Sequence, residues 1–390
     1  MPATAKLYET DPYVQTFTAT VLVCTPAGEQ FAVQLDRTAF YPEGGGQPCD
    51  TGALGTALVT DVQEHGGMIT HTVSAALPVG QTVEGRIDWA RRRDHMEQHT
   101  GEHILSGTLH RLFGAENVGF HIGSPAVRMD MSVPLTAGQL AEAEAQANAV
   151  IRADAPVRCW YPAPEDLAKL TYRSKKEIDG AVRLVDAGGA DLCACCGTHV
   201  LRSGQVGLVK FLSVQKFREG VRIELLCGKR ALEYLSRTWE QAKAIGQRLS
   251  VKPVDSEAAV ERLEGELASL KLRCAQLEES VFESMAKEQA GKGNVLLFQP
   301  AMRPDSVRRL MDAVSKTCCG LAAVFAGEEG HYAYALGRAD GQDISPLVKA
   351  MNTALHGRGG GRNGFAQGSV ETERSAIESF FKENGYGICD

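Results

Sequence analysis

Residues 95–114 read HMEQHTGEHILSGTLHRLFG. The run ends at a glycine, a common helix C-terminal signal, and it predicts one helix that begins near Asp88 or Asp94. His99 and His103 stand four residues apart within it. That spacing puts both imidazoles on one face of a helix, one turn apart, as a metal ion requires. Such a pair also occurs by chance, so the metal prediction depends on a second pair of ligands.

The second pair lies further along the chain, in the segment CCGTH at residues 195–199. Its first thiol and its imidazole are four residues apart with a glycine between them, so both can turn onto one ion. Three histidines and one cysteine form a borderline-soft donor set that suits zinc. We therefore expect one zinc ion per chain, bound by His99, His103, Cys195 and His199. The alternative ligands are Cys193 and Cys196, and also His95, His110 and His121, which we expect behind the ligands or at the surface.

The segments around these motifs divide the chain into four expected domains of an α+β protein. Residues 1–90 hold short β-rich runs punctuated by glycines, which predicts a small β-barrel. Residues 91–227 combine the histidine helix, a helix near 136–153 and strand-like runs around the cysteines. Residues 228–290 are helical, and residues 291–390 alternate buried strands with helices, as in a small α/β domain.

Within the helical segment, apolar residues recur in steps of three and four. They are Val260, Leu263, Leu267, Leu270, Cys274, Leu277 and Val281. About three heptads suffice for a short coiled coil or for a hairpin with the preceding helix. We favour an intramolecular arm, and keep a homodimer through this segment or through the C-terminal domain as the alternative.

The composition is typical of a soluble globular protein. The 390 residues are 44% hydrophobic and 23% charged, and they contain no apolar run long enough to cross a membrane. The 11 cysteines include two vicinal pairs, which fits reduced thiols better than a disulfide framework. The first residues lack the apolar stretch of a secretory signal. We therefore expect a cytoplasmic protein.

The ligand motifs HTGEH and CCGTH resemble the HxxxH and CxxxH motifs of the editing domain of alanyl-tRNA synthetases and of free-standing AlaX-type editing proteins. FYPEGGGQP, residues 40–48, resembles the glycine-rich motif of the family's barrel. GFHIG, residues 119–123, resembles the strands after the zinc helix. GGGR, residues 359–362, followed by AQG, resembles the C-terminal domain shared with DHH-type phosphoesterases. Since no aminoacylation domain accompanies these motifs, the resemblance implies a free-standing editing protein of the long form.

Two departures from the family's pattern stand out. Cys196 replaces a glycine of the synthetase motif CGGTH and leaves the choice of thiolate ligand open. Gly101 and Glu102 stand where small and apolar residues are usual, and we expect Glu102 to be a surface charge.

The resemblance implies hydrolysis of the ester that joins a wrong amino acid to tRNA(Ala), with serine the first expected cargo and glycine the next. A pocket for alanine discriminates against either by only about 1–3 kcal/mol, so a second site must remove the errors. Gln47 and Thr100 are the candidates for contacting the serine hydroxyl or positioning water. The backbone amides of Gly45 and Gly46 are the candidates for stabilising an oxyanion. Zinc could activate water or orient the substrate, and a closed set of four protein ligands favours orientation.

An RNA substrate requires phosphate contacts even though the net charge is −7. We place them at Arg91, Arg92 and Arg93 beside the zinc helix, and at Arg358 and Arg362 in a C-terminal loop. Two other functions stay open. One is a zinc-stabilised tRNA-binding module without hydrolase activity. The other is editing of another mischarged tRNA, because the editing domains of threonyl-tRNA synthetases share both ligand motifs.

Overall fold

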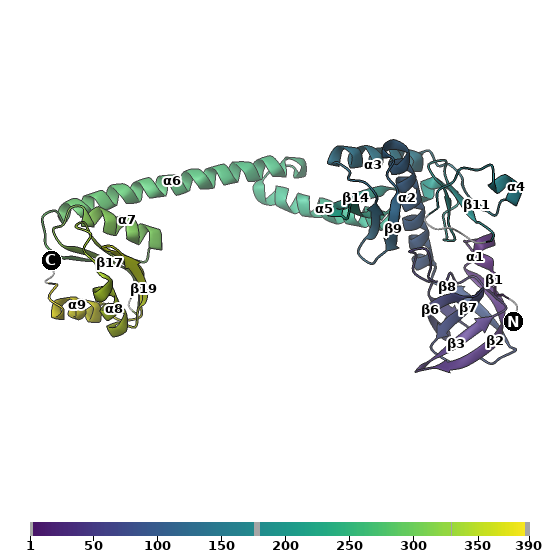
Figure 1. The fold of residues 1–390 in the computed structure, drawn as a ribbon, viewed down its shortest axis with the longest axis horizontal. Coiled ribbons are helices and arrows are strands. Elements are labelled where there is room, and N and C mark those ends of the chain that lie inside the picture. The colour runs from purple at the N-terminus through teal and green to yellow at the C-terminus, as the bar shows by residue number, and fades with distance from the viewer. Residues whose placement is uncertain (1–2, 175–179, 329, 387–390) are drawn as a thin grey trace. The chain divides into compact units, whose positions relative to one another are not determined.

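The computed structural model describes residues 3–174, 180–328 and 330–386. The chain forms two compact units, Met1–Ala244 and Ile245–Asp390 (Figure 1). The expected barrel and editing domains belong to one unit. The border between the units falls inside helix α5 (Gly228–Leu249), within the helical segment expected at 228–290.

The N-terminal part of the first unit is a closed barrel with the strand order β2-β3-β7-β6-β5-β8, drawn in purple in Figure 1. Its strands are β2 (Thr16–Ala27), β3 (Gln30–Leu35), β5 (Gly52–Leu54), β6 (Ala57–His65), β7 (Met68–Val73) and β8 (Thr82–Ile87). Inward and outward side chains alternate, as in β6, where Ala57 and Val59 are buried and Leu58 is exposed. The predicted barrel is thus confirmed. Beside it lie helix α1 (Leu7–Thr10) and a short parallel pair, β1 (Ala5–Lys6) with β4 (Arg37–Thr38).

The helix predicted from residues 95–114 is α2 (Trp89–Phe113). Asp88 caps its first turn by accepting a hydrogen bond from Arg91 N, and Gly114 ends it in the left-handed conformation with φ at +64°. Helix α2 packs against α3 (Ala137–Arg152) and against strands of two small sheets, so most of its length is buried.

The two sheets complete the first unit. One has the order β14-β15-β10-β9, and its strands are β9 (Asn117–Ile122), β10 (Val127–Met131), β14 (Val209–Phe217) and β15 (Gly220–Cys227). The other consists of β11 (Val157–Trp160), β12 (Leu184–Ala187) and β13 (Leu192–Ala194). The short helices α4 (Pro164–Leu167) and η1 (Ser203–Val206) lie in the connections.

The second unit consists of one long helix and an α/β body. The helix is α6 (Ser256–Glu288), preceded by η2 (Pro253–Asp255). A sheet with the order β16-β17-β18-β20-β19 follows, with β16 parallel to β17 and the other pairs antiparallel. Its strands are β16 (Val295–Gln299), β17 (Leu321–Glu328), β18 (His331–Arg338), β19 (Arg358–Arg362) and β20 (Phe365–Val370), and its helices are α7 (Pro304–Ser315), α8 (Ser345–Ala354) and α9 (Arg374–Glu383).

One expectation for this unit changes. Arg358 and Arg362 lie on β19, an edge strand, and not in a loop. The heptad residues form one continuous helix of 33 residues whose apolar line is exposed. None of the helices in the described ranges is long and apolar enough to cross a membrane.

Candidate metal centre

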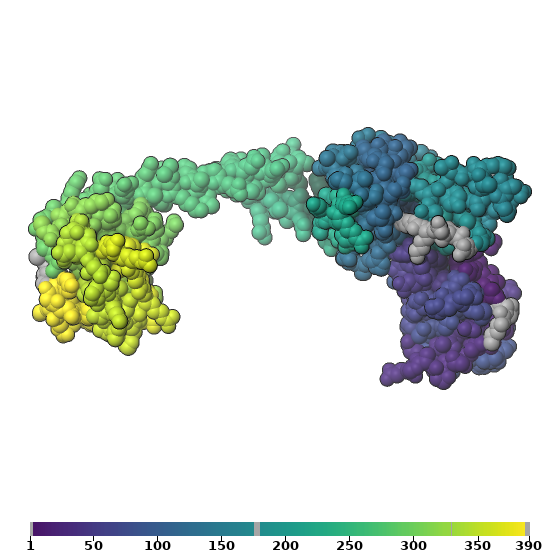
Figure 2. Space-filling view, viewed as in Figure 1, coloured from purple at the N-terminus to yellow at the C-terminus, as the bar shows by residue number. Residues whose placement is uncertain are grey.

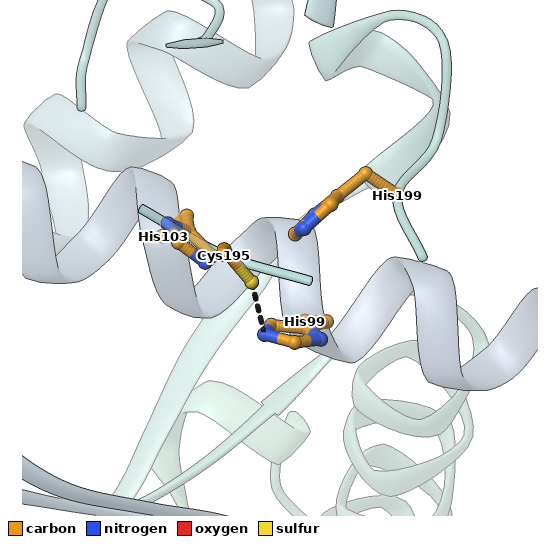
Figure 3. Close-up of side chains that lie close together, drawn as sticks. All are labelled: His99, His103, Cys195 and His199. Atoms are coloured by element: carbon orange, nitrogen blue, oxygen red, sulfur yellow. Dashed lines mark hydrogen bonds between the residues drawn. The ribbon is translucent and has the colours of Figure 1, made fainter. Parts of the chain in front are cut away.

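Four side chains converge at the middle of α2. His99 and His103 come from successive turns of the helix, and Cys195 and His199 come from the loop after β13 (Figure 3). Their ligand atoms all lie within 4.8 Å of one another. Cys195 Sγ is 3.5 Å from His99 Nε2, the dashed line in Figure 3. The structure therefore brings together the four predicted ligands.

Gln47 holds His99 in place from the barrel side. The Gln47 Oε1 atom accepts a hydrogen bond from His99 Nδ1 at 2.8 Å and another from Thr198 N at 3.2 Å. The amide of Gln47 donates to Thr198 Oγ1 at 2.8 Å, and the side chain has no exposed surface. Gln47 thereby fixes both a ligand of the helix and the loop that carries the other pair.

Thr100 holds the ring of His199 in place, as Gln47 holds that of His99. The Thr100 Oγ1 atom lies 3.2 Å from His199 Nδ1 and accepts a hydrogen bond from Val200 N. Figure 3 shows the His199 ring pointing toward the other three side chains. Its Nε2 atom is buried and has no hydrogen-bond partner among the residues that the structure describes. A buried polar atom without a partner is costly, and a metal ion at the centre of the cluster would supply that partner.

Asp191 holds the third histidine and is a residue that the sequence reasoning missed. Its Oδ2 atom lies 2.9 Å from His103 Nδ1, and Arg173 donates to both carboxylate oxygens at 2.8 and 2.9 Å. A carboxylate behind a metal-binding histidine fixes the ring and its tautomer. Asp191 precedes Cys195 by four residues, but nothing in that spacing distinguishes it from a surface aspartate.

All three imidazoles are thus tied at Nδ1, which leaves Nε2 as the nitrogen available to a metal. Gln47 and Thr100, the two candidates for substrate contact, are hydrogen-bond partners of the candidate ligands His99 and His199. Their proposed contact with a serine hydroxyl stays a prediction.

The electrostatics of the cluster suit a metal ion. Burial lowers the pKa of His199 to about 3, so its ring is neutral. Burial opposes ionisation of Cys195, but the neighbouring His99 and His103 outweigh it and hold the pKa of this thiol well below its usual value. Burial also opposes protonation of His103, but Cys195 and Asp191 raise its pKa well above the usual value.

The alternative ligands fit less well. Cys193 forms a second group of potential ligands with His103 and Asp191, but the Asp191 carboxylate already accepts two hydrogen bonds from Arg173 and lies against His103 Nδ1. The remaining four candidates belong to neither of the groups found among the described residues; they are Cys196, His95, His110 and His121. One thiolate and three imidazoles remain, a donor set that fits zinc.

Comparison with known proteins finds two alanyl-tRNA editing proteins that match nearly the whole chain. It is 28% identical to the alanyl-tRNA editing protein AlaX-L of Pyrococcus horikoshii, over 95% of this chain and 96% of the relative. It is 27% identical to the alanyl-tRNA editing protein Aarsd1 of Danio rerio, over 96% and 97%. The chain is a homologue of the alanyl-tRNA editing proteins.

Longer proteins match the chain as well. The alanine–tRNA ligase of Pyrococcus abyssi is 33% identical over 98% of this chain, which spans only 44% of the ligase. Family models match residues 14–91 (tRNA synthetases class II (A)), residues 182–224 (threonyl and alanyl tRNA synthetase second additional domain) and residues 291–383 (DHHA1 domain). The second of these stretches contains Cys195 and His199.

The glycine-rich motif of the chain forms a tight turn at the rim of the barrel. Gly44 and Gln47 exchange two backbone hydrogen bonds, and Gly45 and Gly46 between them have φ at +59° and +85°. A side chain at Gly46 would meet the carbonyl oxygen of Phe120 at 2.4 Å. Only glycine therefore fits this position, which brings the turn against β9 beside His99.

Glu102 corrects the expectation of a surface charge. It is 1% exposed and accepts a hydrogen bond from Asn117 Nδ2. Its carboxylate is therefore a buried charge of α2 that bonds Asn117 on β9.

The structure corrects the expectation that Arg92 contacts phosphates of the RNA. Its guanidinium is fully buried and bonds Asp50, Pro12 O and Ala39 O, so it joins α2 to the barrel and cannot reach RNA. Arg91 and Arg93 are partly buried: Arg91 donates to a backbone carbonyl, and Arg93 pairs with a glutamate on α2. Arg358 and Arg362 are exposed on β19.

Proposed function

We propose that this protein hydrolyses the ester bond of mischarged tRNA(Ala), with seryl-tRNA(Ala) as the chief substrate and glycyl-tRNA(Ala) as the second. The observation that carries the proposal is the buried cluster of three histidines and one cysteine, with each imidazole tied at Nδ1. It is supported by homology to alanyl-tRNA editing proteins along nearly the whole chain. A cytoplasmic location fits such a role in translation and stays part of the proposal.

The four cluster residues would hold zinc, which when bound supplies a positive charge that polarises an ester carbonyl or acidifies a water. The chain's own contribution is orientation. Gln47, Thr100 and Asp191 fix the three imidazoles before substrate arrives, so no rearrangement of these rings is required during the reaction.

The glycine turn is the proposed site for the developing negative charge. The amides of Gly45 and Gly46 lie between the two backbone bonds that close the turn and take no part in them. Backbone donors of this kind typically contribute about 3 kcal/mol each to stabilising an oxyanion. We propose these two amides for that role.

A cavity of about 650 Å³ is lined by Asp191 and Arg173 together with Arg111 and Tyr172, on the Nδ1 side of His103. The four cluster residues are not among its lining residues. We propose that the aminoacyl end instead reaches the cluster itself, with the side chain of the amino acid next to Gln47 or Thr100. Serine would then gain a hydrogen bond that alanine cannot make, which is the kind of difference that separates substrates by more than a methyl group does.

The remainder of the RNA requires phosphate contacts. Arg358 and Arg362 are the exposed candidates on the second unit, and Arg91 and Arg93 are the partly buried ones on the first. Binding through such contacts weakens as salt rises. We expect removal of residues 291–390 to weaken tRNA binding more than it slows ester cleavage.

The test compares deacylation of seryl-, glycyl- and alanyl-tRNA(Ala), with seryl-tRNA(Thr) as a fourth substrate. We expect rapid release of serine from tRNA(Ala), slower release of glycine and no release of alanine. Faster release from tRNA(Thr) would show editing of another mischarged tRNA.

A zinc-stabilised tRNA-binding module is the second candidate, because four protein ligands form a closed site that is more often structural than catalytic. Binding of seryl-tRNA(Ala) without release of serine would support this candidate and contradict the hydrolase.

A further inference from the structure

Tyr161 is an exposed aromatic side chain directly after β11. It is 50% exposed, and outside α5 no other aromatic side chain in the described part of the first unit is as exposed. Its hydroxyl donates a hydrogen bond to Glu9 Oε2 of α1 at 2.9 Å. Figure 2 shows the teal surface around β11 next to the purple N-terminal elements that include α1. Tyr161 therefore offers an exposed ring that is held in place at its hydroxyl.

The strand register places Tyr161 in one row with the metal-ligand candidate Cys195. In the sheet β11-β12-β13, the last residue of β11 pairs with the first of β12, which pairs with the last of β13. The next row holds Tyr161, Arg183 and Cys195, and Cys195 N donates to Arg183 O at 3.0 Å. Neighbouring strands lie about 4.8 Å apart, so the backbones at Tyr161 and Cys195 are separated by about 10 Å.

This row faces the same side of the sheet as the metal cluster. Side chains two residues apart along a strand point to the same face, so Tyr161 shares a face with Cys159, and Cys195 shares one with Cys193. Cys159 and Cys193 lie in one row of the sheet, and Cys193 is grouped with the ligand His103. The ring of Tyr161 is therefore on the metal side.

The cluster reaches solvent at the residue that shares this row. Its three histidines are buried, with at most 4% of each exposed. Cys195 is partly exposed, and the following Cys196 is exposed. A substrate that approaches the cluster at Cys195 therefore passes on the side where Tyr161 lies.

Arg183 fixes the middle of the row. Its side chain is buried, and its Nη1 atom donates to the carbonyl oxygens of Cys195 and Gly197 at 2.9 and 3.0 Å. These bonds tie the loop that carries two of the ligands to β12, while the Glu9 bond ties Tyr161 to α1. The separation between the ring and the cluster is thus set before any RNA binds.

We propose that Tyr161 is the stacking platform for the base of the 3′-terminal nucleotide of the acylated RNA, whose ester lies at the cluster. A terminal nucleoside bridges the gap, because its ribose carries the ester at one side and the base at the other. Unpaired bases at RNA ends stack on aromatic side chains regardless of their identity, because every base has a π-face. The ligand, an aminoacyl-tRNA, rests on the proposed function, whereas the platform is tested by binding alone.

The first experiment uses a hairpin RNA whose single-stranded 3′ end terminates in 2-aminopurine, a base whose fluorescence falls when it stacks. We expect quenching by the wild type, no quenching by Tyr161→Ala and binding that is weaker by about 5- to 150-fold. Tyr234→Ala is the matched control, because Tyr234 is an exposed tyrosine of α5 in the same unit. It should behave as the wild type. Absence of quenching by the wild type, or equal quenching by Tyr161→Ala, would overturn the proposal.

Tyr161→Phe separates stacking from a purely structural role. This variant keeps the ring and loses the bond to Glu9. We expect it to quench and bind as the wild type does, with circular dichroism showing that all variants are folded. If Tyr161→Phe lost as much affinity as Tyr161→Ala, the hydrogen bond to α1 would be the relevant contact and the platform would be refuted.

A second RNA that lacks only the terminal base tests which base stacks. Its removal should weaken binding to the wild type and cause no further loss in Tyr161→Ala, because both changes delete the same contact. Equal losses in the two proteins would place the terminal base elsewhere and contradict the proposal.

Serine release by the same proteins distinguishes this proposal from the proposed function. With seryl-tRNA(Ala), we expect Tyr161→Ala to raise KM and leave kcat nearly unchanged. A wild type that quenches the probe but releases no serine would contradict the hydrolase and support the platform. Serine release with equal KM in the wild type and Tyr161→Ala would contradict the platform and support the hydrolase.

Discussion

The two longest helices in the described part of the chain, α2 and α6, differ in which kind of side chain they bury. Helix α2 buries His99, Glu102 and His103, three residues that usually prefer water. Helix α6 exposes leucines such as Leu267 and Leu270, although its heptad pattern is the clearer of the two. Hydrophobic periodicity alone therefore does not decide which face of a helix is covered.

The difference has a physical cause in the partners. The polar residues of α2 bond other polar groups: Gln47 holds His99, Asp191 holds His103 and Asn117 holds Glu102. Buried polar groups persist only when they are satisfied in this way. The apolar line of helix α6 stays exposed within the described part of its unit. Burial of polar residues on a helix therefore depends on partner groups from other elements, whereas a heptad pattern alone does not bury apolar residues.

The largest expected effect comes from removing the thiolate of the α2 cluster. Cys195→Ala leaves only imidazoles, so we expect loss of zinc on dialysis and a fall in deacylation of more than about 100-fold. Metal analysis and initial rates measure the two quantities. The neighbouring Cys196→Ala is the control, because Cys196 is exposed and lies outside the cluster. A C195A protein that kept both zinc and activity would show that the ligand set is wrong.

The second effect concerns the base of α2. Arg92→Ala leaves the carboxylate of Asp50 buried without its partner, and we expect a loss of about 3–5 kcal/mol in the free energy of unfolding. Urea denaturation measures it. Arg358→Ala, on an exposed strand, should change stability by less than about 0.5 kcal/mol. If R92A were stable and instead bound tRNA poorly, the structural role of Arg92 would be refuted.

A smaller effect is expected behind the cluster. Asp191→Asn keeps the shape of the side chain but removes the charge that orients His103, so zinc affinity should fall by about 10- to 100-fold. Competition with a fluorescent chelator measures the affinity without reference to activity. Asp166→Asn, at an exposed aspartate on α4, is the control. Equal affinities for all three proteins would mean that Asp191 does not support the ligand.

The smallest effect is a pH dependence of the free energy of unfolding, and it arises from His95 on α2. Burial lowers the pKa of His95 to about 3, from an ordinary value of 6.5 in the unfolded chain. The unfolded chain therefore binds a proton first as the pH falls, and the stabilisation present above pH 6.5 is lost toward pH 3. Between pH 7.5 and pH 5 we expect His95 to account for about 1–2 kcal/mol.

The matched variant is His95→Gln, whose unfolding free energy should fall less over the same pH range. Burial lowers the pKa of His71 and His199 in the same direction, so part of the dependence remains in this variant. Identical pH profiles for wild type and variant would mean that His95 is not buried as a neutral ring.

Much of the fold and the ligand set could be predicted from sequence, because both rest on local spacing. The barrel followed from short strands between glycines, and the ligands followed from two pairs at intervals of four residues. The support of the ligands could not be predicted, since Gln47 and Asp191 reach His99 and His103 only through the tertiary fold.

Arg92 and Glu102 were misjudged for the same reason. Each looks like a solvated charge on a helix, and each is buried because a partner, Asp50 or Asn117, arrives from another element. Sequence spacing identified the helix but not the surfaces that pack around it. The exposure of the apolar residues on α6 could not be predicted either, because a heptad pattern does not say whether the helix that covers them belongs to the same chain.

The most direct test of the central claim is a zinc titration of deacylation. Protein stripped of metal, with the zinc content verified by mass spectrometry, receives increasing zinc while release of serine from seryl-tRNA(Ala) is measured. We predict no activity without metal and a linear rise that ends at one zinc per chain, with alanyl-tRNA(Ala) left intact throughout. Full activity of the verified metal-free protein would contradict the account.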